Sequence, residues 1–390
     1  MKIARAAEDT LRKLYGEYPV VVVTGPRQSG KTTLVRTVFQ NKPYVSLEDL
    51  DEREFANEDP RGFLERYPHG AILDEAQHSP GLFSYIQTRV DNENRSGVFV
   101  LTGSQQFGLL SGVTQSLAGR AAILSLLPFT LGELQTAGSP PSSLQELLVS
   151  GLYPPIYDRN ADAGTWYGNY VRTYLERDVR QILQVRDLST FQRFLRMCAG
   201  RSGQLVNLSA LANDCGVTHN TAKAWLSVLE ASYILYFLRP HHNNFNKRLI
   251  KTPKLYFYDT GLLVWLLGID TPQQVTTHPL YGAIFETWVV GELLKARLNR
   301  GQEPRLSFWQ DHSGHEVDVL VEHSGEAIPV EIKAGQTVAS DFFKGLELWK
   351  TLSEGSSPKG YIVYGGNAHQ KRGHWHVIPW SGIGDLVHAI

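Results

Sequence analysis

The sequence contains few cysteines, no long apolar run and almost no net charge. Two cysteines, Cys198 and Cys215, in 390 residues exclude a disulfide framework and suit a reducing compartment. The two cysteines do not supply the ligands of a zinc site, and we expect histidines such as His241, His242, His312 and His315 to be solvated loop residues. The longest apolar stretches, Val20–Val23 and Leu262–Leu267, fall well short of the roughly 20 residues that cross a membrane. The charged N-terminus has no apolar leader, so we expect a cytoplasmic protein without a membrane partner.

The charge balance excludes a uniformly basic surface for nucleic acid. The chain has 38 Lys and Arg against 39 Asp and Glu, for a formal net charge of −1. A local basic surface remains open, because net charge averages over domains. A hydrophobic content of 42% and a charged content of 20% are globular values. At about 150 residues per domain, the length predicts two or three domains.

The pattern of apolar residues changes twice and predicts a multidomain α/β protein. In residues 1–136, β-branched runs alternate with helical segments, which is typical of a parallel sheet. Residues 137–260 are mainly helical, and 261–390 form a second α/β region in which a helix over 282–298 precedes several strands. The strands that we expect in the first region are Val20–Thr24, Tyr44–Leu47, Ala71–Leu73, Val98–Leu101 and Ala121–Leu126.

Residues 25–32 match the phosphate-loop pattern G-x-x-x-x-G-K-[ST], between a valine-rich strand and a helix over 33–39. Such a loop turns its backbone N–H groups toward a phosphate, and the following helix N-terminus adds positive partial charge. We predict that Lys31 bridges the β- and γ-phosphates of ATP and that Thr32 ligates Mg²⁺. The expected nucleotide-binding residues are Gly25, Pro26, Arg27, Gln28, Ser29, Gly30, Lys31, Thr32 and Thr33.

A short apolar strand ends in Asp74 and Glu75. Because ligands bind at the carboxyl ends of parallel strands, we expect Asp74 to hold Mg²⁺ and Glu75 to act as general base. The strand over 98–101 leads to Thr102 and Ser104. Two interpretations stay open there: either hydroxyl contacts the γ-phosphate as a sensor, or Ser104 caps a helix.

Arg120 is our first candidate for an arginine finger, provided by the same chain or by a neighbour in a homo-oligomer. Arg172 and Arg177 are weaker candidates. The alternative for each of these arginines is an ordinary surface salt bridge.

Residues 208–230 have the pattern of a helix–turn–helix, with Gly216 at the turn. Two predicted strands, 233–238 and 254–258, follow and would complete a winged helix. From 231 to 258 the chain has five basic residues and no acid, which suits contact with DNA phosphates. The alternative is that the winged helix packs on another part of the protein. The DNA-binding residues that we expect are His219, Asn220 and Lys223 on the second helix and Lys247, Arg248 and Lys251 on the loop; Arg239 and Lys254 are the other basic residues of the segment.

A second candidate site lies on two alternating segments, 316–322 and 328–333. As an antiparallel hairpin they would place Asp318 beside Glu331, and strict alternation would put Glu316, Asp318 and Glu322 on one face. Paired carboxylates bind a divalent ion, and Lys333 could orient or deprotonate a water. Glu286, on the preceding helix, could complete the site. The alternative is an exposed face with solvated charges.

These motifs carry a resemblance. VVVTGPRQSGKTT, ILDEAQ, VLTGSQQ, SLAGR and LPFTLGEL resemble an additional-strand P-loop ATPase of AAA type, within a bacterial and archaeal family with a nuclease-like C-terminal domain. The order helix-Glu, strand-Asp, strand-Glu-x-Lys resembles the PD-(D/E)xK nuclease superfamily, although Val317 replaces the usual proline.

The resemblance implies a restriction-endonuclease-like C-terminal domain. It makes Asp318 and Glu331 ligands of Mg²⁺ or Mn²⁺, Lys333 the catalytic lysine and Glu286 an auxiliary acid. The expected function is an ATP-hydrolysing DNA-processing protein with endonuclease activity on structured or branched DNA. The alternative is an ATP-dependent switch that binds DNA or a protein and whose nuclease-like domain is inert.

Overall fold

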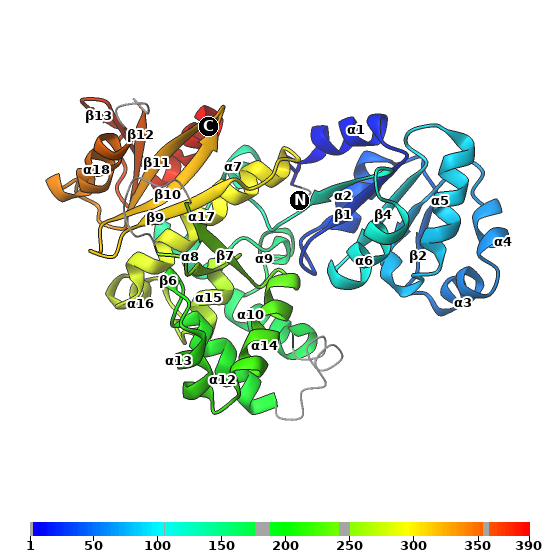
Figure 1. Cartoon of the computed structure of the whole chain (residues 1–390), viewed down its shortest axis with the longest axis horizontal. Helices are drawn as coiled ribbons and strands as arrows, with labels where there is room; N and C mark the ends of the chain where they lie inside the picture. Colours follow the sequence, from blue (N-terminus) through cyan, green and yellow to red (C-terminus); the bar gives the residue numbers. More distant parts are fainter. Residues whose placement is uncertain (1–2, 105, 176–187, 242–249, 354–358) are drawn as a thin grey trace. The chain divides into compact units, whose positions relative to one another are not determined.

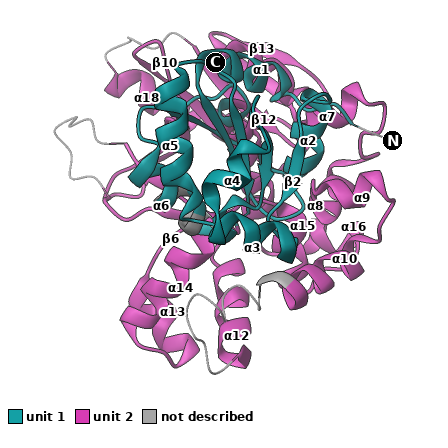
Figure 2. Cartoon of the chain, turned by 90° about the vertical axis from the view of Figure 1, so that its right-hand side faces the viewer, with its two compact units in different colours: residues 1–129, 231–233, 297–303 teal, residues 130–230, 234–296, 304–390 magenta. Residues whose placement is uncertain are grey.

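The computed structural model describes residues 3–104, 106–175, 188–241, 250–353 and 359–390. The chain separates into two compact units, coloured separately in Figure 2. Unit 1 contains residues 1–129, 231–233 and 297–303, and unit 2 contains residues 130–230, 234–296 and 304–390. Within the described ranges, no helix combines the length and the apolar character that crossing a bilayer requires.

Unit 1 is built on a five-stranded sheet in the order β2-β3-β4-β1-β5, with every pair of neighbours parallel. Figure 1 labels three of these strands, β1, β2 and β4. The strands are β1 (Val20–Thr24), β2 (Tyr44–Ser46), β3 (Ile72–Asp74), β4 (Phe99–Gly103) and β5 (Ala121–Ser125). Its helices are α1 (Glu8–Glu17), α2 (Lys31–Val38), α3 (Leu50–Glu58), α4 (Pro60–Glu65), η1 (Ala76–His78), α5 (Leu82–Glu93) and α6 (Gln106–Ser116). The predicted parallel sheet of the first region is confirmed.

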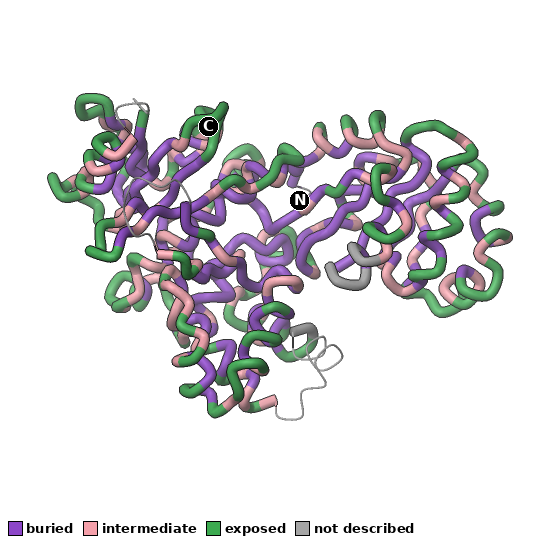
Figure 3. The backbone as a smooth tube through the Cα atoms, in the orientation of Figure 1, coloured by how far each residue is buried: buried purple, intermediate pink, exposed green. Residues whose placement is uncertain are grey.

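Helices cover both faces of this sheet, and the alternation of β1 explains how. Val21 and Val23 pack in one cluster with Leu11 of α1 and Leu34 of α2. Val20 and Val22 point the other way, into a cluster with residues of α3, α4, α5 and α6. Each residue of β1 is buried, as Figure 3 shows along the strand. A run of four valines therefore suits this strand, because both of its faces are covered.

Unit 2 combines helices with a nine-stranded sheet in the order β13-β14-β12-β11-β10-β9-β7-β8-β6. The strands are β6 (Gln204–Leu205), β7 (Leu235–Pro240), β8 (Lys254–Phe257), β9 (Leu306–Gln310), β10 (Glu316–His323), β11 (Glu326–Lys333), β12 (Gly360–Tyr364), β13 (Gln370–Arg372) and β14 (Trp375–Pro379). The helices up to the first of these strands are α7 (Leu131–Thr136), α8 (Leu144–Ser150), α9 (Pro154–Asp158), α10 (Ala163–Tyr170), η2 (Val171–Leu175) and α12 (Leu188–Ala199). The later ones are α13 (Leu208–Cys215), α14 (His219–Ala231), α15 (Thr260–Leu266), α16 (Pro272–Thr277), α17 (Tyr281–Asn299), η3 (Ser340–Phe343), α18 (Lys344–Leu352), η4 (Trp380–Gly382) and α19 (Ile383–Ala389).

The large sheet crosses residue 260, where we expected a domain boundary. β7 pairs antiparallel with β8, as the wing of the predicted winged helix requires. β7 also pairs in parallel with β9, where Arg239 lies opposite Ser307. The two strands of the predicted wing and the C-terminal strands are therefore parts of one sheet. The division into three domains stays a prediction.

The two helices of the predicted helix–turn–helix are α13 and α14. Gly216 takes a left-handed conformation (φ 69°) at the end of α13. The Thr218 hydroxyl then accepts a hydrogen bond from the backbone N–H of Thr221 (3.1 Å) and caps α14. Trp225 of α14 packs edge-on against Phe191 and Phe194 of α12, at centroid distances of 5.3 and 5.1 Å. The face of α14 that carries Trp225 therefore packs against α12.

The β10–β11 hairpin forms with a two-residue turn, in which Ser324 and Gly325 have positive φ (51° and 85°). Strict alternation along β10 is wrong, however. The register against β9 shifts between Val317 and Leu320, and both residues pack in one cluster with Trp309 and Trp349. This bulge moves the pattern by one residue. Glu322 is exposed and does not join Glu316 and Asp318.

Candidate functional site

The phosphate loop of unit 1 has backbone conformations that its sequence explains. Gly25 (φ 144°) and Gly30 (φ 92°) take positive φ, and Gln28 (φ 64°) does so as well. A side chain at Gly25 would overlap the carbonyl oxygen of Leu126, so the loop needs glycine there for space as well as for conformation. Helix α2 begins at Lys31, two residues before the start that we expected.

Lys31 is held against the loop by hydrogen bonds. Its Nζ donates to the carbonyl oxygens of Gly25 (2.9 Å) and Pro26 (2.8 Å). Burial lowers the pKa of Lys31 to about 8, although Glu75 and Asp74 act to raise it. A phosphate would replace the carbonyl oxygens as the partner of this ammonium, in surroundings where a charge interaction is stronger than in water.

Asp74 and Thr32 meet at the carboxyl end of β3. The Thr32 hydroxyl lies 3.0 and 3.2 Å from the two carboxylate oxygens of Asp74. The hydroxyls of Tyr44 (2.7 Å) and Thr102 also donate to this carboxylate. A hydroxyl beside a carboxylate is the oxygen donor set that Mg²⁺ prefers, so these residues fit the predicted ion.

Glu75 follows directly, in a left-handed conformation (φ 53°). Its Oε2 accepts hydrogen bonds from Gln77 Nε2 (2.5 Å) and from the Ser104 hydroxyl (3.1 Å). Burial acts to raise the pKa of Glu75, but Lys31 and these hydrogen bonds outweigh it, so the pKa is lower than usual. Glu75 is therefore ionised at neutral pH. The structure brings together Asp74, Glu75, Thr102 and Ser104, which the sequence assigned to one site.

Arg120 lies away from this site. Its guanidinium pairs with Asp91, from Nε to Oδ1 at 2.5 Å and from Nη2 to Oδ2 at 2.9 Å. Its carbonyl oxygen accepts from the N–H of Val20, at the start of β1, whereas the phosphate loop follows the end of β1. Five strand residues span about 16 Å, which an arginine side chain does not bridge. A role for Arg120 at its own phosphate loop is thus corrected; a role at a neighbour's loop stays a prediction.

The other two arginine candidates stay untested. Arg172 is exposed in η2 of unit 2, and Arg177 lies outside the described residues.

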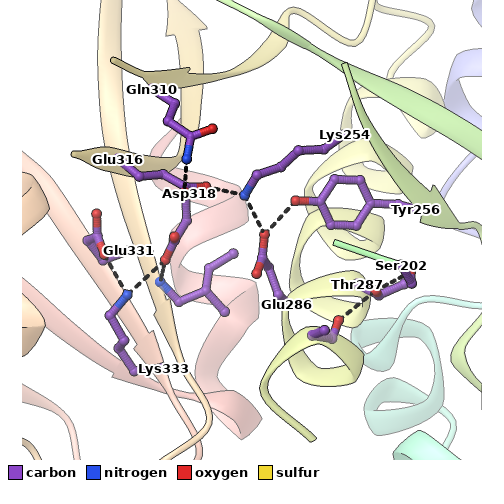
Figure 4. Close-up of polar contacts among 12 residues, drawn as sticks. Ser202, Lys254, Tyr256, Glu286, Thr287, Gln310, Glu316, Asp318, Glu331 and Lys333 are labelled. Carbon is purple, nitrogen blue, oxygen red and sulfur yellow. Dashed lines mark hydrogen bonds and ion pairs between the residues drawn. The ribbon is translucent and has the colours of Figure 1, made fainter. Parts of the chain in front are cut away.

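The second site, in unit 2, joins the predicted trio (Figure 4). Asp318 Oδ2 accepts from the backbone N–H of Ile332 (2.7 Å) and from Lys333 Nζ (3.1 Å). Lys333 Nζ also donates to Glu331 Oε2 (2.7 Å). The hairpin therefore places one lysine between two carboxylates, on neighbouring strands.

The electrostatics of this trio favour a bound cation. Burial, and then the charge of Asp318, raise the pKa of Glu331 to about 8, although Lys333 acts to lower it. Glu331 Oε1 is buried and has no hydrogen-bond partner among the described residues. A buried carboxylate oxygen without a partner is costly, and a divalent ion would satisfy it. The residues present therefore fit a metal ion.

Glu286 joins the same region through a lysine that we had counted only among the basic residues of the segment 231–258. Lys254 is 5% exposed, and its Nζ pairs with Glu286 Oε1 (3.3 Å) and with Glu316 (Figure 4). The Tyr256 hydroxyl donates to Glu286 Oε1 (2.5 Å). Burial raises the pKa of Glu286 despite the nearby ammonium of Lys254. Lys254 and Tyr256 share one face of β8, and that spacing of two was the signal that sequence reasoning missed.

The predicted DNA-binding residues are exposed where the structure describes them. His219, Asn220 and Lys223 lie in the first turns of α14, and Lys251 precedes β8. Lys247 and Arg248 lie outside the described residues. Contact with DNA stays a prediction for all six.

The fold and the phosphate loop of unit 1 define a P-loop ATPase domain. Residues 17–135 match the family model described as an AAA domain. Residues 141–273 and 281–383 match two models described as domains of unknown function, DUF8612 and DUF4143. The uncharacterized proteins Rv2008c of Mycobacterium tuberculosis and Mb2031c of Mycobacterium bovis are each 34% identical over 338 residues, 85% of this chain and 74% of theirs. The chain belongs to the same family as these two uncharacterized proteins.

Solved structures with weaker likeness include the Walker-type ATPase PABY2304 of Pyrococcus abyssi. It is 14% identical, with a TM-score of 0.44, over 67% of this chain and 94% of that chain. The RuvB Holliday junction branch migration motor of Thermotoga maritima is 20% identical, with a TM-score of 0.32, over 60% and 89%. The assignment of unit 1 rests on its own sheet order, its phosphate loop and the AAA family model.

Proposed function

We propose that the protein is an ATP-dependent DNA-processing enzyme with a metal-dependent endonuclease site in unit 2. The observation that carries this proposal is the trio Asp318, Glu331 and Lys333, joined through Lys333 Nζ, with a buried carboxylate oxygen left without a partner. A buried carboxylate oxygen without a hydrogen-bond partner is costly in a purely structural role, whereas a metal ligand needs an oxygen that is free to bind the ion.

In this proposal Asp318 and Glu331 hold Mg²⁺ or Mn²⁺, and Lys333 orients the attacking water. The ion, when bound, supplies Lewis-acid stabilisation of the phosphodiester oxygen. Glu331 must give up its proton first, because burial and Asp318 raise its pKa to about 8. Lys254 fixes Glu286 and Glu316 beside the trio and reduces the repulsion among four carboxylates.

The ATPase domain has the parts to bind and hydrolyse a nucleotide. Lys31 would contact the phosphates, and Thr32 and Asp74 would hold Mg²⁺. Glu75, fixed by Ser104, would orient the attacking water.

DNA would contact the exposed N-terminal turns of α14 and the basic segment at Lys251. No strongly basic recognition helix is present among the described residues, so we propose that structure in the DNA, rather than base sequence, is recognised. A homo-oligomer is part of the proposal: Arg120 lies far from its own phosphate loop and would instead contact the nucleotide of a neighbouring subunit.

A cleavage assay tests the endonuclease. The wild-type protein is incubated with duplex, single-stranded, forked and four-way-junction DNA, with Mg²⁺ or Mn²⁺, with and without ATP. Asp318→Asn should abolish cleavage and keep ATP turnover. The matched control is Glu322→Gln, an exposed carboxylate on the same strand, which should cleave like the wild type. Cleavage that persists in Asp318→Asn would refute the assignment.

One observation favours a second candidate, an ATP-dependent switch with an inert nuclease-like domain. The ammonium groups of Lys254 and Lys333 already bind all four carboxylates of the cluster. The switch predicts that no DNA is cleaved under any condition, while the protein binds DNA and Lys31→Ala abolishes ATP turnover.

A further inference from the structure

Three side chains beside the phosphate loop converge on one point. Glu48, Glu75 and His78 each offer a ligand atom, and these atoms all lie within 4.8 Å of one another. Among the described residues this is the one group of three or more His, Cys, Asp or Glu side chains with that geometry. Asp74, the expected Mg²⁺ ligand, does not belong to it.

The fold of unit 1 explains why these residues meet. β2 and β3 pair in parallel with Ser46 opposite Asp74, so Glu48 and Glu75 both follow at the same edge of the sheet. Glu75 then precedes η1, whose last residue is His78. The backbone N–H of His78 donates to the carbonyl oxygen of Glu75 (3.1 Å), which holds the two residues in one turn.

Glu75 is positioned to be a ligand as well as a base. In the described part of the chain, its hydrogen bonds from Gln77 and Ser104 all go to Oε2, which leaves Oε1 available. Glu48 is exposed and His78 is half-buried, so an ion can reach the group from solvent.

The donor set selects the kind of ion. Mg²⁺ prefers oxygen ligands and keeps much of its water, whereas an imidazole favours later transition metals. One imidazole and two carboxylates can hold Zn²⁺ and leave a fourth position open for water. The site would therefore bind Zn²⁺ in the presence of the Mg²⁺ that accompanies ATP.

We propose that Glu48, Glu75 and His78 form a Zn²⁺-binding site whose occupation inhibits ATP hydrolysis. A Glu75 carboxylate engaged by the ion no longer orients the attacking water, while Lys31, Thr32 and Asp74 still bind the nucleotide. The inhibition rests on the proposed role of Glu75 as general base, whereas the binding of Zn²⁺ does not depend on that role.

Binding is measured first, on the full chain without nucleotide. Zn²⁺ is titrated against a chromophoric chelator, and Co²⁺ serves as a spectroscopic probe of an imidazole ligand. His78→Ala should bind one fewer equivalent of Zn²⁺. Loss of a partner outside the first coordination shell lowers metal affinity about 10- to 100-fold, and loss of a direct ligand lowers it further. His69→Ala, an exposed histidine of the same unit, is the matched control and should bind like the wild type. Equal Zn²⁺ binding by wild type and His78→Ala would overturn the site.

Turnover is then measured with Zn²⁺ added over a constant excess of Mg²⁺. Zn²⁺ should inhibit the wild type and His69→Ala, leave binding of a fluorescent ATP analogue unchanged, and have at least about tenfold less effect on His78→Ala. Equal inhibition of His78→Ala would overturn the inhibitory role. A separate variant, Glu75→Gln, tests the base: full turnover in it would refute the role of Glu75 and leave the binding result intact.

Discussion

Replacing Lys254 with methionine tests the charge network of unit 2. Methionine keeps most of the volume and the apolar stem but removes the ammonium. Glu286 and Glu316 then lose their shared partner in a site where the Lys254 side chain is 6% exposed and those of the acids are 17% and 26% exposed. Breaking a buried ion pair on one side typically costs about 3–5 kcal/mol.

Protonation limits that cost and makes it depend on pH. An ordinary glutamate has a pKa of 4.5, and each pKa unit is worth about 1.36 kcal/mol. Keeping one carboxyl protonated therefore costs up to about 3.4 kcal/mol at pH 7 and about 0.7 kcal/mol at pH 5. In the variant the folded state holds more protons than the unfolded state above pH 4.5, so its stability falls as pH rises. Burial would lower the pKa of Lys254 itself, but Glu286 and Glu316 raise it above 10.5, so its own contribution is constant from pH 5 to pH 9.

The assay is urea unfolding followed by tryptophan fluorescence. All eight tryptophans lie in unit 2, so the signal reports that unit alone. We expect Lys254→Met to lose about 3 kcal/mol at pH 7 and less than about 1 kcal/mol at pH 5. The matched control is Lys251→Met, an exposed lysine that should stay within about 0.5 kcal/mol of the wild type. Equal losses at both pH values would show that packing, and not charge, accounts for the effect.

Three further results are expected. The metal affinity of unit 2 should rise about tenfold per pH unit from pH 6 to pH 8 and then level off. The reason is that Glu331, with a pKa of about 8, releases one proton when the metal binds. Calorimetry in two buffers of different ionisation enthalpy would detect that proton. Gly345→Ala places a methyl group against the Glu331 carboxylate and should lower the metal affinity about tenfold or more. The control Gly384→Ala, which has open space around it, should leave the metal affinity unchanged. Unchanged metal affinity in Gly345→Ala would contradict the packing of Gly345 against Glu331. Arg120→Ala should reduce turnover at least about 100-fold without unfolding, and mixing it with Lys31→Ala should restore part of the activity if the arginine serves a neighbour.

The phosphate loop and the parallel sheet of unit 1 could be predicted because their signals are local. Four consecutive valines followed by the glycine-lysine motif specify a buried strand, a turn and a helix start within 20 residues. The acids at the end of β3 could be placed beside the loop for the same reason, since parallel strands align their carboxyl ends.

Residues at the opposite ends of strands were harder to place. The sequence shows Arg120 just before a strand, but its distance from the phosphate loop depends on the pairing of β5 with β1. Within one chain, Arg120 and the phosphate loop therefore lie at opposite ends of strand β1. Only the strand order makes the choice between the same chain and a neighbour visible.

The acid–lysine site was predictable in part. Asp318, Glu331 and Lys333 lie on one hairpin, so alternation and a short turn suffice to bring them together. The bulge that removes Glu322 leaves no such signal, because it depends on how Trp309 and Trp349 pack beside β10. The role of Lys254 was missed because its partners are distant in sequence: Glu286 lies on a helix 32 residues later, and Glu316 lies on a strand 62 residues later. The sheet that brings them together also crosses the expected domain boundary.

The charge count of this site explains how the chain can fold before it binds a metal. Lys254 and Lys333 stand between four carboxylates, those of Glu286, Glu316, Asp318 and Glu331. At neutral pH the raised pKa of Glu331, about 8, keeps most of that group protonated, and burial raises the pKa of Glu286 as well. Protons and lysines thus carry the compensating charge that a divalent ion would supply. An incoming ion must therefore displace a proton from Glu331, and its affinity is set by that exchange as much as by the geometry of the carboxylates.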